Sequence, residues 1–101
     1  MSRIRWTVQA SSDLDAIHEF ISRDSPASAR ALVGRLLAAI DQLESYPQSG
    51  RVVPEFGNSA IRELVRGAYR VVYRLRGEGI ELVRIHHAAR PLPPDLTLSA
   101  G

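Results

Sequence analysis

The sequence of 101 residues contains no cysteine and no long apolar run. The absence of cysteine excludes disulfide bonds and thiolate metal sites, and it fits a reducing compartment. The first residues, Met-Ser-Arg-Ile-Arg-Trp, include no apolar stretch of the length that a signal peptide or a membrane span requires. We therefore expect a single domain that works in the cytoplasm and has no membrane partner.

Lysine is also absent, so all 13 basic side chains are arginines. Codon usage in a GC-rich genome is the favoured reason for this choice, but the chemical consequence is the same whatever the cause. A guanidinium group stays protonated, so it binds and stabilises negative charge but is a poor proton shuttle. The basic side chains are therefore better suited to gripping an anion than to moving a proton.

Charge is unevenly distributed, although the formal net charge is only +2. Residues 10–46 carry six acidic side chains and three arginines, a balance of −3, whereas residues 51–90 carry eight arginines and four acidic side chains, a balance of +4. The second half is thus a candidate contact surface for a polyanion or an acidic protein. A solvated sheet face with internal ion pairs explains the same count equally well.

The first elements are predicted from alternation and capping. Residues 3–8 alternate between polar and apolar side chains, which predicts a half-buried strand. A helix follows, capped by Ser11 or Ser12 and ending near Arg23, with one apolar stripe. The pair Ser25–Pro26 then marks the start of a second helix with a wide apolar stripe, which ends before the next proline, at position 47.

The second half predicts a loop and three strands. Residues 46–60 contain two prolines and two glycines, which indicates a loop. Strands are expected at residues 61–65, 69–76 and 80–87, with a tight turn around residues 77–79. The last strand is apolar on both faces and should therefore be central.

These elements predict an α+β fold in the order β-α-α-β-β-β. The helical hairpin should pack on one face of a mainly antiparallel four-stranded sheet. No helix remains to cover the other face, which should be polar or covered by a partner. The domain should span residues 1–90, and a short proline-rich tail, residues 91–101, should be loose unless a partner holds its leucines.

The order of elements and several short motifs resemble the toxins of the RelE/ParE superfamily from bacterial type II toxin–antitoxin modules. The resemblance covers nearly the whole chain. It is carried by Asp13-Leu14-x-x-Ile17, Leu43-x-x-x-Pro47-x-x-Gly50-Arg51, Ile61-Arg62-Glu63-Leu64, Tyr69-Arg70-Val71-Val72-Tyr73 and His87-x-x-Arg90.

The resemblance implies a toxin that a cognate antitoxin neutralises in a hetero-oligomer. ParE-like members inhibit DNA gyrase by binding, whereas RelE-like members cut mRNA on the ribosome. The sequence has no lysine at any position, and no tyrosine follows Tyr73, so the chain is closer to the ParE branch. We expect a binding inhibitor with no catalytic residue and no cofactor; the alternatives are an endoribonuclease and a non-toxic relic that acts as the co-repressor of its antitoxin.

Candidate site residues follow from both readings. Contacts with the target or the antitoxin are expected from Arg51, Arg62, Arg70, Arg74, Arg84, His87 and Arg90. Under the nuclease alternative the working groups would be His87, Glu63, Arg70 and Arg90.

Several of these side chains also have a structural reading. A cross-strand ion pair with an arginine is the favoured role for Glu63, and core packing is favoured for Tyr69 and Tyr73. His86 and His87 are adjacent on a strand and should point to opposite faces, one of them bonded near the helices. They cannot converge on one ion, so no metal site is expected.

Overall fold

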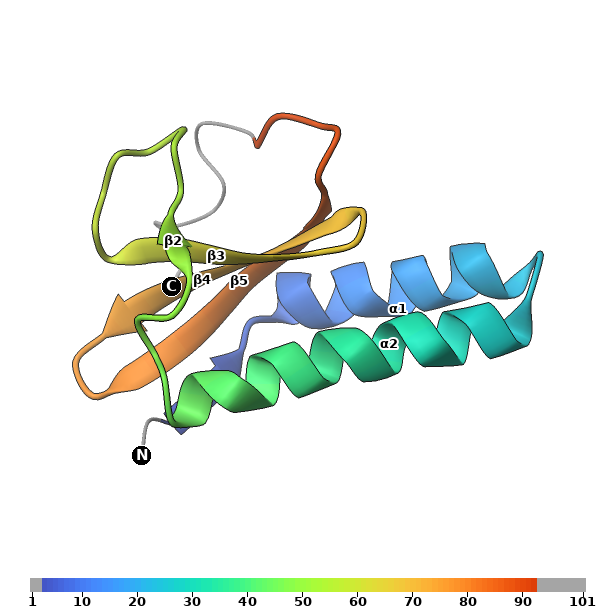
Figure 1. Cartoon of the computed structure of the whole chain (residues 1–101), viewed down its shortest axis with the longest axis horizontal. Coiled ribbons are helices and arrows are strands. Elements are labelled where there is room, and N and C mark those ends of the chain that lie inside the picture. Colours follow the sequence, from blue (N-terminus) through green and yellow to red (C-terminus); the bar gives the residue numbers. More distant parts are fainter. Residues whose placement is uncertain (1–2, 93–101) are drawn as a thin grey trace.

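Two antiparallel helices lie against one face of a mixed sheet, which confirms the two-layer α+β prediction (Figure 1). The computed structural model describes residues 3–92. The elements in chain order are β1 (Arg3–Trp6), α1 (Val8–Ser22), α2 (Pro26–Asp41), the 3-10 turn η1 (Gln42–Glu44), β2 (Arg51–Val52), β3 (Ile61–Arg66), β4 (Tyr69–Arg76) and β5 (Gly79–His87). In the sheet they run β1-β5-β4-β3-β2.

The sheet has five strands where four were predicted. The additional strand, β2, is only two residues long and pairs antiparallel with β3 through Arg51–Glu63 and Val52–Arg62. It lies in the segment whose prolines and glycines predicted a loop, and two residues are too few to give a recognisable alternation. The remaining strand boundaries agree with prediction to within one or two residues.

Helix α1 begins earlier than predicted because Thr7, and not Ser11 or Ser12, is its cap. The Thr7 hydroxyl accepts a hydrogen bond from the Ala10 backbone N–H (3.1 Å) and donates one to the Leu82 carbonyl (2.7 Å). One side chain thus both starts the helix and ties it to β5. As a result β1 ends at Trp6, two residues sooner than expected.

Helix α2 begins as predicted. The Ser25 hydroxyl accepts a hydrogen bond from the Ser28 N–H (3.1 Å), and Pro26 occupies the first turn, where no N–H is needed. The apolar stripe of α2 packs on the sheet and forms the main core. The largest fully buried side chains of this core are those of Leu36, Leu43, Tyr73 and Leu82. No helix within residues 3–92 has the length and apolarity to cross a membrane.

Strand β5 is central, as predicted, because it lies between β1 and β4. It pairs parallel with β1 and antiparallel with β4, and a bulge interrupts the β4 ladder between Val72 and Tyr73. Ile80, Leu82 and Ile85 face the helices, whereas Val83 belongs to a cluster on the opposite face.

That opposite face, here called the outer face, carries its own apolar patch, contrary to the expectation that it is polar or covered by a partner. The patch consists of Val53, Phe56, Ile61, Val72, Val83 and Leu92. The loop after β2 and the segment after β5 both cross the outer face and bury these side chains (Figure 1). Leu92, the second residue of the predicted tail, is therefore held by the chain itself; residues 93–101, with the other tail leucines, lie outside the described part.

Candidate functional site: two arginine clusters and a hollow at the end of β5

Two groups of arginines and carboxylates lie on the outer face. The Glu63 cluster comprises Arg51, Glu55, Glu63 and Arg70. The Glu81 cluster comprises Arg5, Arg74, Arg76 and Glu81. The two clusters together contain three of the seven arginine and histidine side chains that the sequence predicts as contacts, namely Arg51, Arg70 and Arg74.

Glu63 and Arg70 are the buried centre of the Glu63 cluster, whereas the Arg51 side chain is 63% exposed. Arg70 is 6% exposed and donates its Nε–H to Glu63, while its two terminal nitrogens bond to both carboxylate oxygens of Glu55 (2.7 and 2.8 Å). Arg51, which lies opposite Glu63 in the ladder, donates to it as well (2.6 Å). The Arg70 guanidinium lowers the pKa of Glu55 to about 2, despite an opposing effect of desolvation. The paired carboxylates in turn raise the pKa of Arg70.

This geometry confirms that Glu63 forms the cross-strand ion pair that was its favoured role. It also corrects the expectation that Arg70 is available to a phosphate, because all three of its donor nitrogens are already used within the chain. The cluster joins β2, the following loop and β4, and the Leu92 N–H adds a contact to Glu55 (3.4 Å). The cluster thereby holds the loop after β2 and the segment after β5 in place on the outer face.

Arg62 holds the two loops that flank β2. Its guanidinium donates to three backbone carbonyls, those of Ser59 (3.1 Å), Gln48 (3.3 Å) and Gly50 (3.0 Å). These bonds satisfy loop carbonyls that have no ladder partner. The predicted contact residue Arg62 is therefore engaged in the fold.

Tyr73 explains the Pro47-x-x-Gly50 motif. Its buried hydroxyl accepts a hydrogen bond from the Gly50 N–H (2.9 Å) and donates one to the Pro47 carbonyl (2.8 Å). A Cβ atom on Gly50 would lie 2.6 Å from both the Tyr73 hydroxyl and the Glu63 carbonyl oxygen, so only glycine fits. Burial raises the pKa of the Tyr73 phenol. Core packing, the favoured reading for Tyr73, is confirmed.

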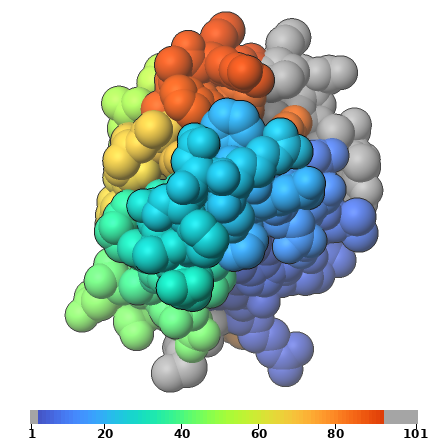
Figure 2. Space-filling view, turned by 90° about the vertical axis from the view of Figure 1, so that its right-hand side faces the viewer, coloured from blue at the N-terminus to red at the C-terminus, as the bar shows by residue number. Residues whose placement is uncertain are grey.

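A hollow of about 330 Å³ lies where the end of β5 meets α1. In Figure 2 the red segment at the end of β5 rests against the blue of α1 on the face toward the viewer. The lining includes apolar and polar side chains: Ile17, Phe20, Tyr69, Arg84, His86, His87 and Arg90. Phe20 is 66% exposed, so the hollow has an apolar rim.

Tyr69 and His87 form a ring pair in this hollow. They lie opposite each other in the β4–β5 ladder, with ring centroids 5.4 Å apart and an interplanar angle of 76°. The exposed His87 accepts a hydrogen bond at Nδ1 from the Ala89 N–H (3.1 Å). Tyr69 packs against the main core, so this pair lies on the helix side of the sheet.

His86 lies opposite Arg70 in the ladder and therefore on the outer face. Its Nε2 is 3.1 Å from the Arg90 carbonyl oxygen. The prediction that the two histidines point to opposite faces is thus confirmed. His87, on the helix side, accepts its hydrogen bond from a backbone N–H of its own turn and does not bond to a helix residue. Within residues 3–92 no group of three or more histidine, aspartate or glutamate side chains is placed to hold a metal ion.

Arg84 is held by Asp13 of α1, a partner that the sequence did not reveal. Its Nε and one terminal nitrogen donate to the Asp13 carboxylate (2.9 and 3.3 Å), which also accepts from the Ile85 N–H (2.9 Å). The two residues are 71 positions apart, so no local pattern predicts the pair. Of the expected contact residues, Arg51, His87 and Arg90 are exposed.

The comparisons with known proteins agree with this architecture. The sequence profile of the family described as "ParE toxin of type II toxin-antitoxin system, parDE" matches residues 4–92. The chain is 37% identical over 91 residues to toxin RelE2 of Caulobacter vibrioides, covering 89% of this chain and 99% of that protein.

Two solved structures share the fold. One is described as the chromosomal ParDE system of P. aeruginosa (TM-score 0.70, 26% identity, 86% of this chain and 96% of that one). The other is the toxin–antitoxin complex RelBE2 of Mycobacterium tuberculosis (TM-score 0.54, 22% identity, 85% of this chain and 96% of that one). The predicted superfamily is confirmed, and the chain belongs to the ParE toxin family of type II toxin–antitoxin systems.

Proposed function

We propose that this toxin inhibits DNA gyrase by binding it, and that a cognate antitoxin neutralises the toxin in a hetero-oligomer. The antitoxin is supported by the ParDE relative, whose description names a toxin–antitoxin system. An amphipathic helix in a groove or an added strand is the mode that fits such a partner. This function would place the toxin in the cytoplasm.

The observation that carries the gyrase proposal is the separation of the groups that RNA cleavage would need. Cleavage through the 2′-hydroxyl requires a proton acceptor, a stabilised phosphate and a proton donor within reach of one another. Glu63 and Arg70 are bonded to each other on the outer face, whereas His87 lies on the helix side with Tyr69. These groups do not converge, which favours action by binding.

A second candidate, an mRNA endoribonuclease, is favoured by a different observation. The hollow at the end of β5 brings a phenol and an imidazole together, with the exposed Arg90 on its lining. Imidazole titrates near neutral pH and can take part in proton transfer, and a guanidinium can hold phosphate. In this reading Tyr69 and His87 replace the Glu63–Arg70 pair.

Parallel assays separate the two candidates. The purified toxin is added to gyrase with supercoiled plasmid and, separately, to translating ribosomes with labelled mRNA. We expect loss of supercoiling or trapped DNA cleavage in the first assay and intact mRNA in the second. Codon-phased cuts with unaffected gyrase would refute the proposal, and silence in both assays would leave the co-repressor relic.

His87→Ala sharpens the comparison, with His18→Ala as the matched control on the exposed surface of α1. A nuclease that uses His87 should lose on the order of 10²-fold or more in cleavage rate. A binder should keep most of its effect on gyrase, and the control should leave both assays unchanged.

A further inference from the structure

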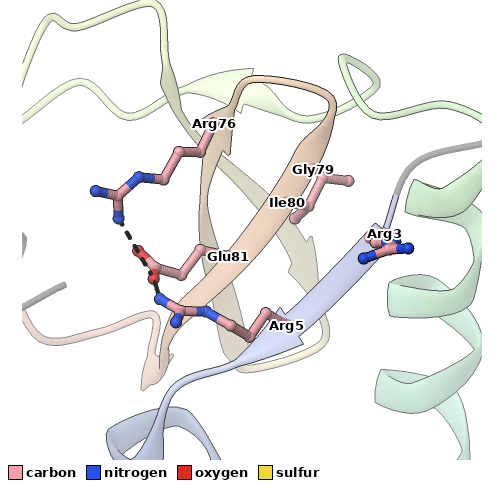
Figure 3. Close-up of a pocket in the computed structure, with 6 residues that line it drawn as sticks. All are labelled: Arg3, Arg5, Arg76, Gly79, Ile80 and Glu81. Atoms are coloured by element: carbon pink, nitrogen blue, oxygen red, sulfur yellow. Dashed lines mark hydrogen bonds and ion pairs between the residues drawn. The ribbon is translucent and has the colours of Figure 1, made fainter.

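Within residues 3–92, three arginines reach the single carboxylate of Glu81. Glu81 is 3% exposed, and Arg5, Arg74 (2.8 Å) and Arg76 (3.7 Å) all reach it. Figure 3 shows Arg5 and Arg76 approaching this carboxylate from neighbouring strands. Arg3, Arg5 and Arg76 line a hollow of about 370 Å³ together with Glu81, so its lining carries three arginines and one carboxylate.

The ladder explains why the arginines gather there. Strand β5 lies between β1 and β4, and the register sets Arg5 and Arg74 on either side of Glu81. Two residues earlier, it sets Arg3 and Arg76 on either side of Gly79. Residues two apart in a strand point to the same face. The first of these rows has a carboxylate between two arginines; the second has no side chain at its centre.

The crowding of cations has an electrostatic consequence. Burial lowers the pKa of Arg74, and the charges of Arg76 and Arg5 lower it further. Arg5 and Arg76 remain well exposed, with 67% and 58% of their side chains accessible. An anion placed between Arg3 and Arg76 would therefore meet an attractive potential and guanidinium groups that solvent can reach.

The surroundings identify the class of anion. A guanidinium fork matches the geometry of phosphate. The residues that line the hollow include no aromatic ring, and the neighbouring Trp6 packs against the main core, so single-stranded bases have no stacking platform. In the part of the chain that the structure describes, Ile80 is the only large apolar side chain of the lining, and it is 2% exposed, so this part of the surface offers a protein partner no anchor.

We propose that Arg3, Gly79 and Arg76, with Arg5 beside them, form a binding site for the phosphates of duplex DNA, used without regard to base sequence. Contacts to phosphates alone position a protein on a duplex and carry no sequence information. This inference goes beyond the gyrase proposal. It concerns the toxin and DNA alone, so either proposal can fail while the other stands.

The test measures binding of a short labelled duplex by fluorescence anisotropy over a range of salt concentrations, without gyrase. If about three phosphates are contacted, log K should fall against log salt with a slope of about −2.7. Arg3→Gln/Arg76→Gln should make the slope shallower by about 1.8 and weaken binding at low salt on the order of tenfold or more. The control Arg30→Gln/Arg35→Gln removes the same charge from exposed positions of α2 and should change neither quantity to that extent.

A second pair of variants tests the vacant position directly. A Cβ atom at Gly79 would have only ordinary contacts, at 3.5 and 3.6 Å, so a side chain is tolerated there. Gly79→Glu should place a carboxylate between Arg3 and Arg76 and abolish DNA binding without loss of thermal stability. Gly79→Gln, of the same size but uncharged, should keep most of the binding.

Three outcomes would overturn the inference. The first is equal weakening by the α2 control or no weakening by Arg3→Gln/Arg76→Gln. The second is binding of a single-stranded RNA of the same length as tightly as the duplex. The third is displacement of the duplex by a glutamate-rich peptide at equal charge concentration, which would identify an acidic protein as the ligand.

Discussion

The two arginine clusters of the outer face contain the same residue types but differ in the ion pairing and exposure of their arginines. In the Glu63 cluster two arginines meet two carboxylates, and Arg70 is buried with every donor nitrogen bonded. In the Glu81 cluster three arginines share one carboxylate, and two of them remain largely exposed. The count of arginines in a strand therefore says little about binding. The number of carboxylates within reach decides whether a guanidinium holds the fold or is left for a partner.

The largest expected effect is that of Arg70→Ala. The substitution leaves Glu63, whose side chain is 0% exposed, with Arg51 as its remaining ion-pair partner. Removing one member of a buried ion pair costs about 3–5 kcal/mol, which urea unfolding would detect as a lower midpoint with an unchanged slope. Arg76→Ala, in the other cluster, is the control. A loss below about 1 kcal/mol would mean that the Glu63 cluster does not hold the outer face together.

A smaller effect is expected from acid. The pKa of Glu55 falls from 4.5 to about 2 in the folded protein because Arg70 bonds to it. A carboxylate with a lowered pKa contributes stability that is complete above about pH 4.5 and is lost as the pH falls toward 2.

Glu55→Gln should therefore flatten the fall in unfolding free energy across this acid range, as followed by thermal melts at successive pH values. Glu78→Gln, at an exposed position of the β4–β5 turn, should retain the wild-type pH dependence. If Glu55→Gln shows the same fall in unfolding free energy at acid pH as the wild type, other carboxylates are responsible for the acid sensitivity.

The smallest effect should come from Arg76→Gln. Its carboxylate contact is long, at 3.7 Å, and its charge lowers the pKa of Arg74. We expect a change within about 0.5 kcal/mol, with a slight stabilisation at low salt that disappears at high salt as the repulsion is screened. A loss comparable to that of Arg70→Ala would remove the distinction between the two clusters.

Local signals predicted most of the fold. Ser25 and Pro26 fix the start of α2, and the core packing predicted for Tyr69 and Tyr73 is found, because each signal depends on neighbours along the chain. The cap at Thr7 was missed because Ser11 and Ser12 offer the same local capping signal, whereas the bond that fixes Thr7 against Leu82 joins residues 75 positions apart. The two-residue strand β2 exists only through its pairing with β3.

The site was less predictable than the fold for the same reason. The sequence identified the relevant arginines, but their availability depends on carboxylates far away in the chain. Arg84 is held by a residue 71 positions earlier, and Arg70 by one 15 positions earlier. The Glu81 cluster needs the parallel pairing of the first strand with the last, which was not predicted.

The parallel pairing of β1 with β5 also determines when the protein can finish folding during synthesis. Strand β5 lies between β1 and β4 but is the last of the five described strands to be synthesised, and β1 has no neighbour in the sheet until β5 arrives. A nascent chain that stops before residue 79 lacks Ile80, Leu82 and Ile85, so the core between the helices and the sheet is incomplete. The β1–β5 ladder and the core can therefore be completed only after β5 has been synthesised, near the end of the described part of the chain.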